Sequence, residues 1–235
     1  MSKEYCGELL VMVQMSAKRK TMKIVETIFD LSYLLTVLIS ALLLYITADT
    51  GSLRWQFAIM ALTLGIGDAF HLIPRICSMA DKKGRNYTAV LGVGKLIASI
   101  TMTVFYIFLW EIGKDHYIFN TNTYISIIVY GCALLRIILC ILPHNRWSSA
   151  NTPLIWGIIR NIPFFILGMT VMIFYLIAAV NTGGSLSFVW LSIMISFACH
   201  MPVVLFSKSH PKVGMLMLPK SCAYAAIVLM GFSLV

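Results

Sequence analysis

The chain has 235 residues, of which 60% are hydrophobic and only 11% are charged, and its mean hydropathy is +0.89. A soluble domain carries roughly a quarter charged residues, so this composition excludes an ordinary soluble domain and predicts an all-α membrane protein with several spans. The formal net charge of +9 would suggest nucleic-acid binding in a soluble protein. In a membrane protein we interpret it as an excess of Lys and Arg in cytoplasmic loops, and we expect no nucleic-acid partner.

Seven stretches are apolar over the roughly 20 residues that a bilayer crossing requires. The predicted spans are 24–47, 54–74, 87–111, 122–142, 153–179, 185–206 and 213–234. Residues 1–22 are predicted to form a cytoplasmic or interfacial segment with a short helix over 5–17, and residues 23–235 to form one transmembrane domain.

Basic residues alternate between the loops and predict the orientation of the chain. On one side they are Lys18, Arg19, Lys20, Lys23, Arg75, Lys82, Lys83, Arg85, Arg146, Lys208 and Lys212. The loops on the other side carry only Arg54 and Lys114 as cations. We therefore expect the N-terminus in the cytoplasm and the C-terminus outside, in a cell membrane (plasma or inner).

Ionisable residues recur at a similar depth in every predicted span. They are Glu26 and Asp30, then Asp68 and His71, then Lys95, Arg136, Arg160, His200 and Lys220 in successive spans. At 1.5 Å per residue, most lie on the order of 10 Å below the cytoplasmic surface. A charge at the bilayer centre costs roughly 2.5–3.5 kcal/mol even on lenient scales. We therefore expect these side chains to face a shared polar cavity in the cytoplasmic half of the bundle.

A second interpretation of this charged layer is structural. The charges would pair with one another and set the register of the helices, while Lys95 and Arg136 would extend to the interface and leave the layer. In either case Asp68, His71 and Arg75 share one helix face, because they are spaced i, i+3, i+7.

Four prolines stand beside these charges: Pro74, Pro163, Pro202 and Pro219. Each removes a backbone hydrogen bond inside a predicted span. Backbone groups freed in this way are tolerated in membranes only where protein or water satisfies them. We therefore expect four interrupted helices around the polar site.

The third span combines a polar stripe with small residues. A polar stripe runs along this span from the charged layer toward the outer side of the membrane; its residues recur at helical spacing and are Lys95, Ser99, Thr103 and Tyr106. The hydroxyls of Ser99 and Thr103 could instead bond to carbonyls of their own helix. The small residues Gly92, Gly94 and Ala98 would let a neighbouring helix approach closely.

Three chemistries fit these residue types. For acid–base hydrolysis the candidate catalytic residues are Asp68, His71 and His200. The candidate ligand-binding residues, which would hold an anion or oxyanion, are Lys95, Ser99, Arg160, Lys220 and Arg75. No cofactor is predicted; zinc on Asp68, His71, His200, Cys199 and Cys222 is a weaker alternative, because no metal-binding pair stands on any one span. The third chemistry is a Schiff base on Lys220, the lysine of the seventh span, as in retinal proteins. Such a site would need an acid on the third span, which carries Lys95 instead.

Two blocks carry a resemblance to known proteins: Gly67-Asp68 followed by Leu72-Ile73-Pro74-Arg75, and Gly94-Lys95 followed through Ser99 and Thr101-Met102-Thr103 by Phe105-Tyr106. Together they resemble uncharacterised bacterial seven-span membrane proteins. More remotely, the order of Gly-Asp, Pro and a Gly- and aromatic-containing span is similar to the lysoplasmalogenase-like family, whose members cleave the vinyl-ether bond of lysoplasmalogens with intramembrane aspartates. The resemblance implies a catalytic role for Asp68 alone. This chain departs from the family pattern because it lacks a second acid in a later span and has seven spans rather than eight.

Three functions therefore remain open at the level of sequence. The first is a lipid-directed hydrolase acting on lysolipids or ether lipids, and the second is a carrier or receptor for a small anion or lipid headgroup. The third is a non-catalytic scaffold with a purely structural charge layer. Membrane lipids and a small anionic or lipid ligand are the expected partners, and the oligomeric state is open.

Overall fold

The computed structural model describes residues 3–81, 83–117, 123–149, 152–207 and 209–234, with side chains from Thr21 onward except that of Pro211. The predicted basic residues Lys18, Arg19, Lys20, Lys82 and Lys208 lie outside the described side chains.

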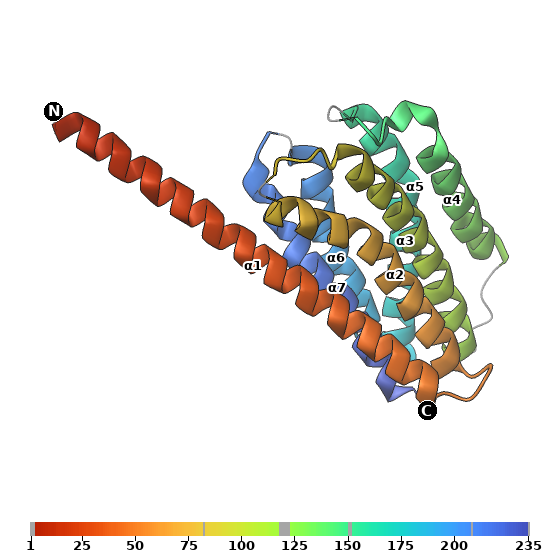
Figure 1. Ribbon diagram of the computed structural model, residues 1–235. Helices are drawn as coiled ribbons and strands as arrows, with labels where there is room; N and C mark the ends of the chain where they lie inside the picture. Colours follow the sequence, from red (N-terminus) through yellow and green to blue (C-terminus); the bar gives the residue numbers. More distant parts are fainter. Residues whose placement is uncertain (1–2, 82, 118–122, 150–151, 208, 235) are drawn as a thin grey trace.

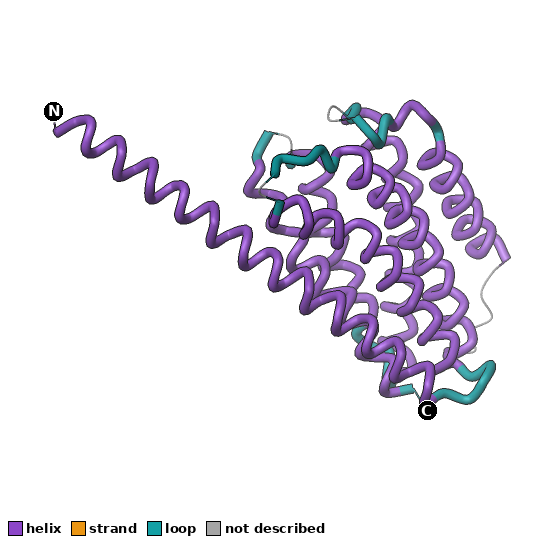
Figure 2. Tube along the Cα trace, viewed as in Figure 1, coloured by secondary structure: helices purple, strands orange, loops and turns teal. Residues whose placement is uncertain are grey.

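All regular structure in the described ranges is helical (Figure 2). The helices are α1 (Lys3–Thr47), α2 (Leu53–Ala80), α3 (Thr88–Tyr117), α4 (Thr123–Ile141), α5 (Leu154–Thr182), α6 (Val189–Phe206) and α7 (Met217–Met230). Short 3-10 turns are η1 (Pro143–Asn145), η2 (Pro211–Leu216) and η3 (Gly231–Ser233).

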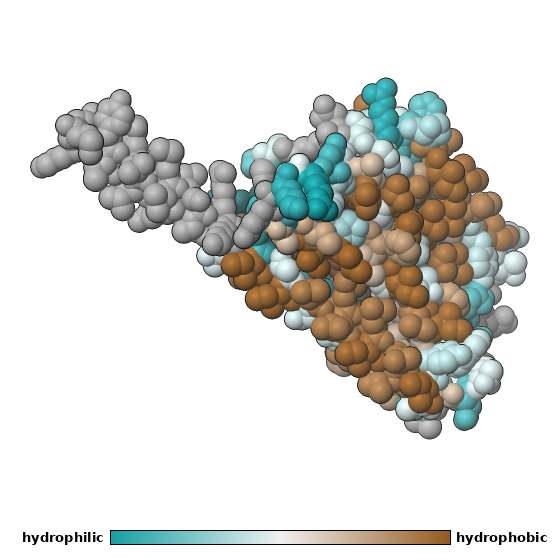
Figure 3. Space-filling model, in the orientation of Figure 1, coloured by the Kyte–Doolittle hydropathy of each residue, from teal (hydrophilic) through white to brown (hydrophobic). Residues whose placement is uncertain are grey.

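Seven helical stretches in the described ranges are long and apolar enough to cross a membrane, which confirms the all-α prediction and the number of helices able to form spans. Large apolar side chains such as Ile127, Ile155 and Val180 are exposed on the outside. Figure 3 shows hydrophobic residues covering the middle of one face, with hydrophilic residues toward its ends. Because such a surface is stable only against an apolar solvent, the fold is consistent with a membrane protein.

The helices form a closed ring with one helix outside it. Neighbours in the chain pack side by side, and α7 packs on α1 (Figure 1). The outer helix is α4, which packs on both α3 and α5 while α3 and α5 also contact each other. Side chains with no exposed surface, among them Val37, Phe57, Leu109 and Ile193, fill the interior.

The first helix differs from the prediction of a separate short helix over 5–17. It is one helix of 45 residues, about 68 Å long at 1.5 Å per residue, whereas the hydrocarbon core of a bilayer is about 30 Å thick. Residues 8–47 contain no Gly or Pro to stop it. Its N-terminal part therefore projects beyond the bundle (Figure 1).

The predicted interruptions at proline are wrong in three of four helices. Pro74, Pro163 and Pro202 lie inside continuous α-helices. Only the last span is divided, into η2 and α7, with Pro219 in the first turn of α7. A single proline removes one hydrogen bond but does not end a helix whose other bonds and neighbours remain.

Two glycines of α3 allow close backbone approach, as the small residues there predicted. Pro74 leaves the carbonyl of Phe70 without its usual donor four residues later. A side-chain carbon on Gly94 would overlap that carbonyl oxygen. A side-chain carbon on Gly92 would likewise overlap the backbone of Trp147. The absence of a side chain at both positions thus brings α2 and the α4–α5 connection against α3.

Candidate functional site

A cavity of about 290 Å³, lined by both charged and apolar side chains, lies inside the ring of helices. It is lined by seven of the eight predicted site residues: Asp68, His71, Lys95, Ser99, Arg160, His200 and Lys220. A smaller cavity of about 40 Å³ adjoins it, sharing Asp68, His71 and Lys220, and contains the eighth residue, Arg75. The structure therefore brings the predicted residues together, although their roles stay predictions.

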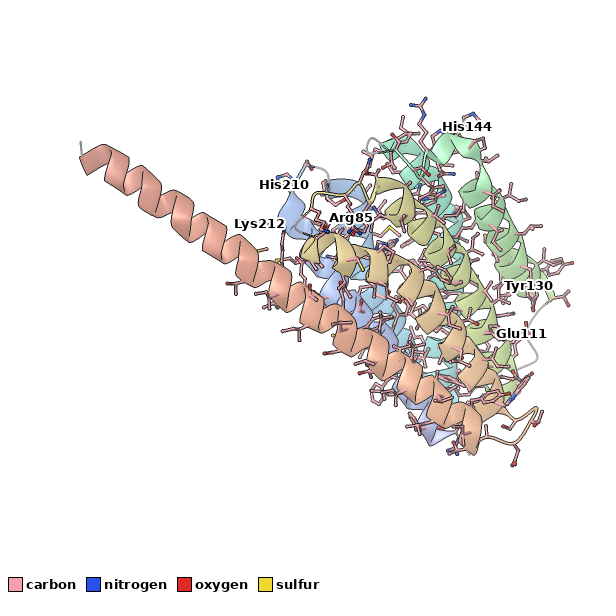
Figure 4. All side chains as sticks on the ribbon, viewed as in Figure 1. Arg85, Glu111, Tyr130, His144, His210 and Lys212 are labelled. Atoms are coloured by element: carbon pink, nitrogen blue, oxygen red, sulfur yellow. The ribbon has the colours of Figure 1, made fainter. Side chains whose placement is uncertain are left out.

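The cavity lies toward the end of the bundle that carries the α2–α3 and α4–α5 connections. Its lining includes Trp147 and Pro153 from the second of these connections and Ser207 just beyond α6. Arg85, His144, His210 and Lys212 lie at this end, whereas Glu111 and Tyr130 lie toward the other (Figure 4). The depth estimated by counting residues from the span ends is therefore consistent with the fold.

Asp68 is held by a residue that the sequence interpretation missed. The hydroxyl of Tyr33 on α1 donates to Asp68 Oδ2 over 2.6 Å. Tyr33 is buried. Among the described residues, Asp68 forms no ion pair within 4.0 Å. Its charge is therefore stabilised by a neutral donor and by cations farther away.

Arg75 belongs to a separate, paired cluster. Its guanidinium lies 3.0 Å from Glu26 Oε2 and 3.6 Å from Asp30 Oδ2, and Asp30 is buried. Two carboxylates of α1 thus neutralise Arg75 of α2. The structural interpretation of the charged layer fits this part of it, because these charges mainly join two helices.

Lys220 and His200 begin a chain of hydrogen bonds that crosses three helices. Lys220 Nζ lies 3.4 Å from His200 Nδ1, and His200 Nε2 lies 3.4 Å from Asn161 Oδ1. An ammonium can only donate and an amide oxygen can only accept. His200 is therefore assigned as neutral with its proton on Nε2, and neither ring nitrogen is left free. Asn161 in turn donates to the Gly157 carbonyl over 2.7 Å.

Arg160 is positioned by the turn between α4 and α5. Its guanidinium donates to Asn145 Oδ1 over 2.8 Å and lies 4.1 Å from the ring centre of Trp147. Asn145 is buried and donates to the carbonyls of Leu139 and Leu142 over 2.6 and 2.9 Å. The side-chain amide of Asn145 thus bonds to carbonyls at the end of α4 and orients the guanidinium of Arg160 on α5. The spacing of residues in the sequence does not predict this pairing.

Arg136 lies in the cavity wall, as expected of the shared charged layer, and not at the interface, where the second interpretation placed it. Only 4% of its surface is exposed, and its guanidinium lies 3.2 Å from the ring centre of Phe164. Its Nε and one terminal nitrogen are buried without a hydrogen-bond partner among the described residues. Its depth was recognised in the sequence, but it was not among the residues predicted to bind a ligand.

Three further residues of the cavity wall, Lys95, Ser99 and His71, differ in whether their polar atoms have partners in the described chain. Lys95 is exposed and, in the part of the chain that the structure describes, forms no ion pair. Ser99 donates its hydroxyl proton to the Lys95 carbonyl over 2.7 Å, as the alternative interpretation of the stripe expected. His71 Nδ1 is buried and has no partner among the described residues.

The metal alternative gains no support from the geometry. Among the described residues, no three His, Cys, Asp or Glu side chains come close enough together to hold a metal ion. His200, one of the expected ligands, has both ring nitrogens within hydrogen-bonding distance of protein groups.

The charge of the cavity wall is strongly one-sided. Among the described residues that line the cavity, four are cations (Lys95, Arg136, Arg160 and Lys220), and Asp68 carries the single carboxylate. Comparisons of the chain with family models, curated proteins and solved structures found no match. The function of this seven-helix protein must therefore be argued from the cavity itself.

Proposed function

We propose that the protein binds a small anion, or the anionic headgroup of a lipid, in the 290 Å³ cavity. The observation that carries this proposal is the excess of four cations over one carboxylate in the described part of the cavity wall. Fields from such groups act more strongly in a pocket with low-dielectric walls than in water. Phosphates and carboxylates are the anions that Lys and Arg bind best in proteins.

The pairing pattern favours a ligand over a purely structural charge layer. Charges that only set helix register should be neutralised by each other, as Arg75 is by Glu26 and Asp30. The cations around the larger cavity have neutral partners instead: Arg160 bonds to Asn145 and Lys220 to His200. An anionic ligand would supply the missing charge.

The site is proposed to face the cytoplasm. The loops nearest the cavity carry most of the loop Lys and Arg residues, which are enriched on the cytoplasmic side of membrane proteins. In this arrangement the N-terminus is cytoplasmic, the C-terminus is outside, and residues 23–235 form one domain in a plasma or inner membrane. The protein would then act as a carrier or receptor for an anion available at the inner leaflet.

The test is direct binding by the purified protein in lipid nanodiscs. Thermal unfolding is followed while inorganic phosphate, acetate or short-chain anionic lipids are titrated. We expect saturable stabilisation by at least one anion and its loss in Lys95→Gln. The matched control is Lys83→Gln, which removes the same charge from an exposed loop outside the cavity. No saturable stabilisation by any anion would reject the proposal.

A second candidate function is hydrolysis of a lipid that binds in this cavity. The observation that favours it is His71 Nδ1, which is buried beside Asp68 on one face of α2 and has no hydrogen-bond partner among the described residues. His71 could accept the proton of an attacking water molecule, while neighbouring cations stabilise the developing negative charge. Turnover of lysolipids and ether lysolipids by the wild type and by Asp68→Asn tests it. Equal rates in both proteins would remove Asp68 from the chemistry.

A further inference from the structure

Arg136 reaches the cavity from the helix outside the ring. The outer helix α4 packs along the contact between α3 and α5, and the guanidinium lies over Phe164 of α5. The side chain lines the cavity together with Met102 of α3 and Phe164. It therefore forms part of the inner wall although its helix belongs to the outer surface.

The donors of this guanidinium are incompletely used. Nε and one terminal nitrogen are buried with no acceptor among the described residues, and no described carboxylate lies within 4.0 Å of the side chain. A buried polar group without a partner is strongly unfavourable, and native proteins rarely retain one without a reason. The face of Phe164 attracts the positive charge, but an aromatic ring leaves in-plane N–H groups unsatisfied. An acceptor from outside the protein would satisfy them.

The charge and size of the cavity narrow the class of acceptor. A phosphate monoester carries about −1.5 to −2 charge at pH 7 and three strong acceptor oxygens, whereas a carboxylate carries one charge. The guanidinium fork suits two oxygens of one group. Lys95, Arg160 and Lys220 complete a wall able to neutralise more than a single charge. The cavity of about 290 Å³ is at the lower limit of small-molecule sites, about 300–1,000 Å³, which favours a small headgroup over a nucleotide.

From these observations we infer that Arg136 is the inner ligand of a phosphate monoester bound in this cavity. The inference rests on the proposed anion-binding function and names its ligand class and its deepest contact. The phosphate group can come from a free metabolite or from a lipid headgroup. The two sources share their chemistry and differ in the attached chain.

The test compares affinities in wild type, Arg136→Gln and Arg136→Lys in nanodiscs. The probes are glycerol 3-phosphate, lysophosphatidic acid, glycerophosphocholine as a phosphate diester, and lactate as a carboxylate. We expect the wild type to prefer monoesters to the diester and to lactate by roughly tenfold or more. Arg136→Gln should lose monoester affinity by roughly ten- to a hundredfold, as for a hydrogen bond to a charged group. Arg136→Lys should fall between, because it keeps the charge and loses the fork.

The control is Arg85→Gln, which removes an exposed guanidinium from a loop at the same end of the bundle and should leave all affinities unchanged. The ratio of monoester to lactate affinity within one variant does not depend on the fraction of folded protein, so reduced folding of Arg136→Gln cannot imitate the expected result.

A higher affinity for lysophosphatidic acid than for glycerol 3-phosphate supports a lipid source, and equal affinities support a free phosphate ester.

The outcomes separate this inference from the function on which it rests. If the wild type binds none of the probes, the anion-binding function itself is wrong. If the wild type binds monoesters and Arg136→Gln binds them equally well, the role of Arg136 is wrong and anion binding stands. If the wild type binds lactate or the diester as tightly as the monoesters, the ligand class is wrong.

Discussion

Tyr33 on α1 and Asp68 on α2 are joined by a hydrogen bond of 2.6 Å between the phenolic hydroxyl and Oδ2. Among the described residues, Asp68 is the only carboxylate in the wall of the larger cavity, and this bond fixes one of its oxygens. Because the donor is neutral, it orients Asp68 without cancelling the charge. The carboxylate therefore remains able to balance part of the surrounding positive charge.

Replacing Tyr33 with Phe should destabilise the protein by about 1–3 kcal/mol, because a buried charged acceptor would lose its donor. Thermal and denaturant unfolding in detergent measure the change. The matched control is Tyr45→Phe, the same substitution at an exposed position of the same helix, which should change stability by less than about 0.5 kcal/mol. Equal effects of the two substitutions would show that the hydrogen bond contributes nothing.

Gly94→Ala should destabilise the contact between α2 and α3 by about 1–3 kcal/mol, since the added methyl group would overlap the Phe70 carbonyl. Gly131→Ala on α4 is the control, because an added side-chain carbon there meets nothing within 4 Å. That change should stabilise the helix by roughly 0.5–1 kcal/mol. The two changes are thus predicted to have opposite signs in the same unfolding assay, and a stabilising Gly94→Ala would contradict the close approach.

Asn145→Ala should cost about 2–4 kcal/mol of stability, because it removes the donor to several carbonyls at the end of α4 and the acceptor of Arg160. Hydrogen exchange should show faster exchange at the end of α4 in the variant. Asn181→Ala, at an exposed site near the end of α5, serves as the control and should have little effect. Unchanged exchange at α4 would refute the proposed capping by Asn145.

Arg75→Met should destabilise the protein by about 3–5 kcal/mol, because it leaves Glu26 and the buried Asp30 without their cation. Adding Glu26→Gln and Asp30→Asn should restore part of the loss. If the Arg75 cluster is structural, anion affinity in the restored triple variant should stay within about twofold of wild type. A large fall in affinity would instead place Arg75 among the ligand-binding residues.

Much of the site could be predicted by counting residues from the span ends. Lys220 and Asp68 lie far apart in the sequence, yet both line one cavity, because each stands about two helical turns from the same end of its predicted span. The partners of these residues could not be predicted in this way. Tyr33, Asn145 and Trp147 are ordinary residues in the sequence, and only helix packing places them beside the charges.

Lys95 and Arg136 show the limit most clearly. Both were expected to reach the interface under the structural interpretation. Lys95 is exposed, whereas Arg136 is only 4% exposed. Each lies on an apolar helix where spacing gives the depth of a side chain but not the direction in which the helix face turns. For Arg136 that direction depends on the packing of α4 against α3 and α5.

The sequence by itself determined the helical class, the number of spans and the depth of the charged residues. These follow from the transfer of apolar side chains out of water and from the rise of an α-helix, which are local properties of each segment. Only the tertiary structure decided which charges are neutralised, which prolines are tolerated and which cation faces the interior. Those outcomes depend on contacts between helices. A contact between residues distant in the chain leaves no periodic residue pattern in the sequence of either segment.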